Sequence, residues 1–188
     1  MKIELKNFKY SEFMSHETYA FEATVWVDGK RAFTAENGGH GGGDSYFPVN
    51  KGQTHRDMEK IHKQIADHHL PELLTRTPIK GTEDNEWIKR LSNEAIVEIV
   101  IANLIKRKHY AKDMKKDLKK SILLKKPDFE FVKGALEVMT FKGEGRKKIE
   151  QCHINYAKRK HPDCLILNDL PFEEALDVFI TYMEGEDS

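Results

Sequence analysis

Residues 19–36, with the sequence YAFEATVWVDGKRAFTAE, decide the fold of this chain. Apolar and polar side chains alternate through residues 19–27, which is the pattern of a strand with one buried face. Asp28-Gly29 follows, and this pair favours a two-residue hairpin turn. Residues 30–36 then supply a return strand through Ala32, Phe33 and Ala35. The stretch therefore predicts an antiparallel hairpin.

The flanking sequence extends this hairpin into a meander. Residues 2–9 also alternate, and residues 46–49 have the composition of a short edge strand. Thr54 is placed to cap a helix over residues 54–69, with Asp57 in the position of a capping-box partner. We expect an α+β fold in which an N-terminal antiparallel β-meander packs on this helix.

The rest of the chain predicts a helix-rich α/β half with the order α, β, β, α, β, α. Pro71 is expected to end or kink the first helix. The sequence Pro78-Ile79-Lys80-Gly81 is a further break. We place a domain boundary there, giving residues 1–80 and 81–188, although one continuous domain is also compatible with the pattern.

Charge is distributed unevenly along a chain whose formal net charge is zero. Residues 106–126 hold ten Lys or Arg and two Asp, whereas residues 168–188 hold seven acidic residues and no Lys or Arg. The local distribution of charge indicates the kind of binding partner more clearly than the net charge does. The expected partners are therefore macromolecules that meet a basic surface.

The sequence gives no sign of export or of membrane insertion. The first residues, MKIELKNFKYSEF, lack the apolar core of a signal peptide. The longest apolar run covers residues 99–102, far short of the ~20 residues of a membrane helix. Two cysteines, Cys152 and Cys164, are expected to stay reduced. These features predict a cytoplasmic protein.

The sequence Asn37-Gly38-Gly39-His40-Gly41-Gly42-Gly43-Asp44 holds five of the twelve glycines. Backbone N–H groups in such a run can form an anion-binding nest. The run lacks the Lys-Ser/Thr of a phosphate loop and the strand–helix setting of a dinucleotide site. It is alternatively a mobile connection, or a loop that touches a macromolecule. The residues that would act there are Gly39, His40, Gly41, Gly42, Gly43 and Asp44.

Lysines form the second conspicuous feature, on a predicted helix that follows residue 95. They attract phosphate backbones without base specificity, but they also suit an acidic protein partner. A solvated helix face, or a face covered by the acidic tail, would produce the same pattern. The residues expected to contact a macromolecule are Lys108, Lys112, Lys115, Lys116, Lys119, Lys120, Arg146 and Lys147.

The sequence contains no set of residues with the full spacing pattern of a catalytic site or a metal site. The pairs Glu59/His62 and Glu150/His153 have the spacing of di-metal bundle ligands, but the further carboxylates of such a bundle are not evident. Cys152 and His153 are helix neighbours expected to point apart, which does not suit a nucleophile and its base. We therefore predict no cofactor and no metal, and a role other than catalysis.

Short motifs resemble small uncharacterised proteins of bacteria and their phages. They are Glu22-Ala-Thr-Val-Trp-Val-Asp-Gly-Lys30, the glycine run, and Leu165-Ile-Leu-Asn-Asp-Leu-Pro-Phe-Glu-Glu-Ala175. The resemblance implies a mobile-element context and an accessory protein, such as an inhibitor, that binds host machinery. It implies no activity and no catalytic residues.

We expect a non-catalytic binding protein that acts on a host protein or a protein–nucleic-acid assembly. The lysine-rich helix and the glycine-rich loop would be its contact surfaces. The alternative is an enzyme or sensor that binds a nucleotide or another phosphate at residues 38–43. The sequence does not indicate the oligomeric state.

Overall fold

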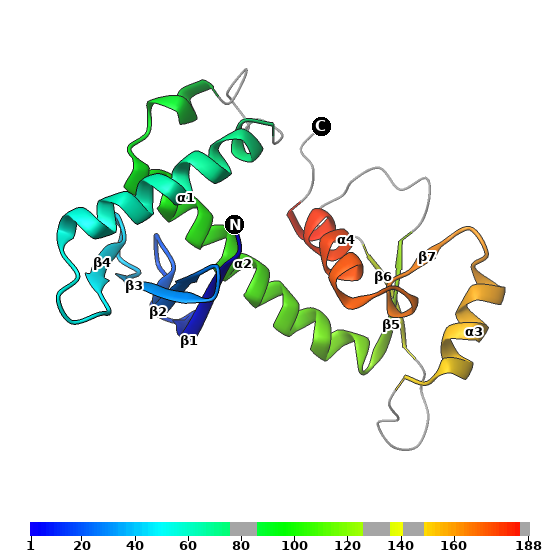
Figure 1. Cartoon of the computed structure of the whole chain (residues 1–188). Helices are drawn as coiled ribbons and strands as arrows, with labels where there is room; N and C mark the ends of the chain where they lie inside the picture. Colours follow the sequence, from blue (N-terminus) through cyan, green and yellow to red (C-terminus); the bar gives the residue numbers. More distant parts are fainter. Residues whose placement is uncertain (76–85, 126–135, 141–148, 185–188) are drawn as a thin grey trace. The chain divides into compact units, whose positions relative to one another are not determined.

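The computed structural model describes residues 1–75, 86–125, 136–140 and 149–184. Its contacts divide the chain into two compact units, Met1–Ile105 and Lys106–Ser188. The boundary predicted at residues 80 and 81 lies outside the described residues. The expected α+β fold is confirmed, because an antiparallel sheet precedes helices and a second, smaller sheet (Figure 1).

A four-stranded antiparallel meander forms the sheet of the N-terminal unit, in the order β1-β2-β3-β4. Its strands are β1 Ile3–Ser11, β2 Ala20–Val27, β3 Lys30–Gly38 and β4 Ser45–Pro48. The predicted hairpin turn is confirmed, since Asp28 and Gly29 have φ values of 47° and 79°. Positive φ at both central residues is the requirement of a type I′ turn.

Two helical segments cover the sheet of the N-terminal unit. They are α1 His55–Thr75 and the first part of α2 Asn93–Leu118, up to Ile105. Their apolar side chains share one core with the inward residues of β1, β2 and β3. Members of this core are Leu5, Phe21, Ala23, Val25, Phe33, Met58, Ile65, Val97, Ile101 and Ile105.

Local signals set the start of α1 but not its end. The amide of Asp57 donates to the hydroxyl of Thr54, and the amide of Thr54 donates to the Asp57 carboxylate, which completes the predicted capping box. Of the two outcomes expected at Pro71, an end of the helix is wrong, because α1 runs on to Thr75, and a kink stays a prediction. Pro71 stands in the last turns, where its missing N–H removes one intrahelical bond near a terminus.

The C-terminal unit has a three-stranded antiparallel sheet in the order β6-β5-β7. Its strands are β5 Ser121–Lys125, β6 Glu137–Thr140 and β7 Leu165–Ile166, and its helices are α3 Gln151–Lys160 and α4 Phe172–Glu184, besides the end of α2. Short 3-10 turns cover Glu86–Arg90 in the N-terminal unit and Leu167–Asp169 here. The predicted order of elements in this half of the chain is confirmed within the described residues.

Strand β5 is buried on both faces, as its unbroken apolar run requires. Ile122 and Leu124 pack on Ile154 and Ala157 of α3. Leu123, on the other face, belongs to a cluster with residues of α2 and α4, among them Met114, Leu176 and Phe179. Within the described residues, no helix is both long enough and apolar enough to cross a membrane.

Candidate functional site

The glycine run, residues 38–43, joins β3 to β4 and lies against the loop between β1 and β2. The carbonyl oxygen of Gly39 accepts hydrogen bonds from the amides of His16 and Glu17, at 3.0 and 3.1 Å. The rings of His16 and His40 stack with their centres 5.5 Å apart. The glycine run therefore fastens two loops of the same unit to each other.

Glycine is needed at Gly39 for two separate reasons. Its φ is +84°, a conformation that side-chain-bearing residues rarely adopt. A Cβ atom there would overlap the carbonyl oxygen of Met14 and lie 2.8 Å from Cβ of Ala20. Glycine at this position thus lets the backbone of the run lie close to the backbone around Met14.

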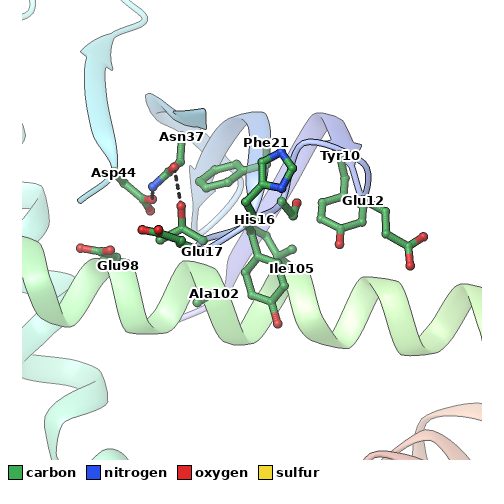
Figure 2. Close-up of a pocket in the computed structure, with 13 residues that line it drawn as sticks. Tyr10, Glu12, His16, Glu17, Phe21, Asn37, Asp44, Glu98, Ala102 and Ile105 are labelled. Atoms are coloured by element: carbon green, nitrogen blue, oxygen red, sulfur yellow. Dashed lines mark hydrogen bonds between the residues drawn. The ribbon is translucent and has the colours of Figure 1, made fainter. Parts of the chain in front are cut away.

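Asn37 organises the loop through its side-chain amide. The nitrogen donates to the Gly42 carbonyl at 3.2 Å and to the Asp44 carboxylate at 3.0 Å, and the oxygen accepts the amide of Gly39 at 2.9 Å. The hydroxyl of Thr18 donates to the same oxygen at 2.8 Å. These bonds hold the Asp44 side chain at one place beside the loop, as Figure 2 shows.

A pocket of about 530 Å³ opens beside this loop, in the N-terminal unit. Its walls come from the end of β1, the following loop, β2, β3, Asp44 and the part of α2 around Glu98. Figure 2 shows the carboxylates of Glu17, Asp44 and Glu98 gathered at one end, with Glu12 at the other. The sequence gave Asp44 as a candidate, but nothing in it brought Glu98 to the same site.

Burial changes the acidity of two of these carboxylates. It raises the pKa of Asp44 to about 6, with nearby Glu98 adding to the rise and the hydrogen bond from Asn37 opposing it. Burial also raises the pKa of Glu98. A phosphate at residues 38–43 would meet this negative field and an Asp44 carboxylate that is largely ionised at pH 7, so the setting opposes an anion.

His62 is the most buried histidine of the described residues, at 2 % exposure. Its ring packs edge-on to Phe33 and Tyr46, with ring centres 4.8 and 4.7 Å away, and Nδ1 lies 3.9 Å from a carboxylate oxygen of Glu94. Burial lowers the pKa of His62. The His62 ring therefore packs as a side chain of the core, a position that suits the neutral form of the imidazole.

The lysine stripe is defined here as Lys108, Lys112, Lys115 and Lys116 of α2, with Lys119 and Lys120 directly after the helix. All six side chains are exposed. The four helical members fall within an arc of roughly 100° and a rise of roughly 12 Å. The opposite side of the helix carries Met114 and Leu118 into the core of the C-terminal unit. Arg146 and Lys147 lie outside the described residues.

The acidic C-terminal region neutralises one margin of this helix. Arg107 donates to the carboxylates of Glu173 and Asp177, at 2.7 and 2.5 Å, and both acids belong to α4. The ammonium of Lys115 lies 4.6 Å from the ring centre of Phe172. The pairs on Arg107 join α4 to α2, and the start of α4 also contacts the stripe at Lys115.

The candidate pairs Glu150/His153 and Cys152/His153 lie at the start of α3, where His153 has a role in capping the helix. Glu150 and His153 form a capping box at the start of α3, in which the Glu150 amide donates to Nδ1 of His153 at 3.0 Å. The expectation that Cys152 and His153 point apart is wrong, since Sγ lies 3.8 Å from Nδ1. That nitrogen turns back to cap the helix and already accepts a backbone N–H. Among the described residues, no three His, Cys, Asp or Glu are grouped to hold a metal ion.

Asn168 is a polar residue that the sequence did not single out. Its side-chain oxygen accepts the amide of Leu123 at 3.0 Å, and its nitrogen donates to the carbonyls of Leu118 and Ser121 at 3.2 and 3.1 Å. The side chain thereby joins the end of α2 to β5. Its partners lie 45 to 50 positions away in the sequence, so no local pattern marks it.

Comparison of the chain with protein-family models, with curated proteins and with solved structures finds no match. The two sites described above, the pocket beside the glycine run and the lysine stripe, are therefore the basis for a functional assignment.

Proposed function

We propose that this chain is a non-catalytic binding protein that holds an acidic protein or a protein–nucleic-acid assembly on its lysine stripe. A single observation carries the proposal: four exposed lysines line one side of a helix whose other side is fixed in a core, and two more follow directly after the helix. A fixed array of cations attracts an extended acidic surface and releases its counterions. The resemblance to accessory proteins of bacteria and phages makes a host partner the first one to test.

The stripe is suited to a partner with repeated negative charge. Its four helical members follow one another at rises of roughly 6, 4.5 and 1.5 Å along the axis. His109 and Asp113 pair with each other at 3.4 Å beside the stripe, so that Asp113 has a partner other than the lysines. Such a row carries no base-reading side chains, and its attraction falls as salt rises.

Charge reversal tests the proposal with a matched control. The variant Lys112→Glu/Lys116→Glu/Lys119→Glu spares Lys115, which packs over Phe172. The control, Lys30→Glu/Lys51→Glu/Lys60→Glu, makes the same charge change on exposed lysines of the N-terminal unit. Each protein is used to capture partners from bacterial lysate at low salt, with and without nuclease, and is applied to immobilised heparin as a defined polyanion.

We expect the wild type and the control to retain the partner, and the stripe variant to lose it and to leave heparin at lower salt. Loss of capture after nuclease treatment would identify nucleic acid as a part of the assembly. Equal capture by all three proteins at low salt would show that the lysine stripe is not the contact surface.

A further inference from the structure

The pocket beside the glycine run has the size of a small-ligand site. Its volume is about 530 Å³, within the range of roughly 300 to 1,000 Å³ that ligand pockets occupy. Its walls come from the end of β1, from β2, β3 and α2, and from the loop between β1 and β2, all within one compact unit. Phe21 and Ile105 of the lining belong to the core of that unit. The pocket is therefore bounded by the core on one side and by a loop on the other.

The charges lining the pocket have one sign. Four carboxylates face it, and none of the described residues that line it is Lys or Arg. A Cβ on Gly43 would lie 3.4 Å from Oε2 of Glu98, and one on Gly41 would overlap Oε2 of Glu17. Both carboxylates thus reach the glycine run, and Asp44 is fixed beside it by Asn37. Three carboxylates at one end of a partly closed cavity select for a positive charge.

Part of the remaining wall is apolar and aromatic. Tyr10 and Tyr19 lie edge to face with ring centres 6.1 Å apart, and Phe21, Ala102 and Ile105 add further apolar surface. The lining also includes four polar side chains, Ser15, His16, Thr18 and Asn37. Aromatic faces attract organic cations, and an apolar wall accepts an alkyl stem. A bare metal ion suits the pocket less well, because the described residues bring no three ligands within reach of one ion.

We propose that this pocket binds an organic cation, an ammonium or guanidinium group on a short apolar stem, with Asp44 and Glu98 as its counter-ions and Tyr10 and Tyr19 beside the stem. The cation replaces the repulsion between neighbouring carboxylates with an attraction. Burial raises the pKa of Asp44 and that of Glu98, so both carboxylates are costly to keep ionised without a nearby cation. This inference is independent of the lysine stripe, which belongs to the other unit.

Two sources can supply this chemistry: a free amine, or the side chain of a Lys or Arg on another protein. Calorimetric titration of the full chain distinguishes them with defined probes. Cadaverine and agmatine represent free amines, and a peptide with blocked ends and a single central arginine represents the side chain. Pentane-1,5-diol has the length of cadaverine without its charges and is the matched control ligand.

We expect saturable binding of one cation per chain, no binding of the diol, and an affinity at least tenfold lower in Asp44→Asn and in Glu98→Gln. Glu36→Gln removes the same charge from an exposed position on β3 outside the pocket, so it should bind as the wild type does. Thermal unfolding of each variant establishes that it is folded. Glu98→Gln keeps the test decisive if Asp44→Asn disturbs the loop.

Binding of the amines indicates a free ligand, and binding of the peptide alone indicates a side chain of a partner; either supports the site. The proposal is overturned if none of the three cations binds saturably at millimolar concentration. It is equally overturned if the diol binds as well as cadaverine, or if Glu36→Gln weakens binding as much as the two pocket variants do.

Discussion

The two units of this chain use charge in opposite ways. In the N-terminal unit, carboxylates are drawn partly inside, held by Asn37 and by α2, and their pKa values rise because burial disfavours the ion. In the C-terminal unit, lysines stay in solvent and the helix that carries them is fixed by its apolar side. The first arrangement favours one compact group of opposite charge, and the second favours an extended surface.

Helix α2 contributes to both arrangements. Its first turns carry Glu94 and Glu98, and its last turns carry Lys112, Lys115 and Lys116. Negative charge near the N-terminus and positive charge near the C-terminus both complement the helix dipole. The distribution of charge along α2 is therefore favourable for the helix itself as well as for the two sites.

The largest effect is expected where the glycine run meets the neighbouring loop. Gly39→Ala should lower the free energy of unfolding of the N-terminal unit by about 3 kcal/mol, because positive φ and overlap with Met14 act together. Gly42→Ala, at a φ of +90° with no atom within 4 Å of the new Cβ, should cost about 1 kcal/mol. Urea unfolding measures both, and equal costs would mean that the close approach contributes nothing.

The C-terminal unit has its own vulnerable point at Asn168. Asn168→Ala leaves the Leu123 amide and two carbonyls without their partner, so we expect a loss of about 2 to 3 kcal/mol. Asn155→Ala on the exposed face of α3 should change stability by less than about 0.5 kcal/mol. Hydrogen exchange at the Leu123 amide reports the same loss locally; unchanged protection there would contradict this role.

A smaller effect concerns the pH dependence of the N-terminal unit. Asp44 has a pKa of about 6 when folded and an ordinary value of 3.8, so its contribution to stability is present below pH 4 and is lost as the pH rises through 6. Asp44→Asn removes that loss. The variant should match the wild type near pH 4 and exceed it by about 1 kcal/mol at pH 7, since partial exposure screens the charge.

Urea unfolding of wild type and Asp44→Asn across this pH range provides the measurement, with Glu36→Gln as the exposed control. A variant that is less stable than the wild type at pH 7 would show that the hydrogen bond from Asn37 outweighs the burial of charge.

The smallest effect is expected at the ion pairs between α2 and α4. Arg107→Gln removes partners of Glu173 and Asp177, whose side chains are largely exposed, so the loss should be below about 1 kcal/mol. It should shrink further in high salt. A loss that is larger, or that salt leaves unchanged, would indicate that packing of the Arg107 stem and not its charge holds α4.

The fold was more predictable from the sequence than the pocket, for physical reasons. Alternation and Asp28-Gly29 act within a few residues, so they predicted the meander and its turn. The lysine stripe was equally visible, because charge on one helix face has the period of the helix. The pocket joins residues from Tyr10 to Ile105 that share no local pattern, and neither Glu98 nor Tyr19 could be placed there without the fold.

The expectations that failed depended on tertiary context. Pro71 was expected to end or kink α1, and the first of these outcomes is wrong because the helix continues to Thr75. Cys152 and His153 were expected to diverge, but capping of α3 turns the imidazole back. Both residues lie near a helix terminus. Pro71 is in the last turns of α1, where its missing N–H removes one hydrogen bond, and the His153 ring caps the start of α3. The glycine run was expected to be a mobile connection, a contact for a macromolecule or an anion site; its use by a partner or a ligand stays a prediction, and the contacts described are with the loop between β1 and β2.

The bonds of Asn168 have a consequence for how the chain is made. Residues Met1–Ile105 form a compact unit whose sheet and core residues all lie within that range. The C-terminal unit differs, because β5 pairs with β7 and is bonded to Asn168, both more than 40 positions later. During translation β6 follows β5 within 20 positions, but the other edge of β5 has no partner until β7 and Asn168 have emerged. That interval leaves one edge of an apolar strand open to misassembly.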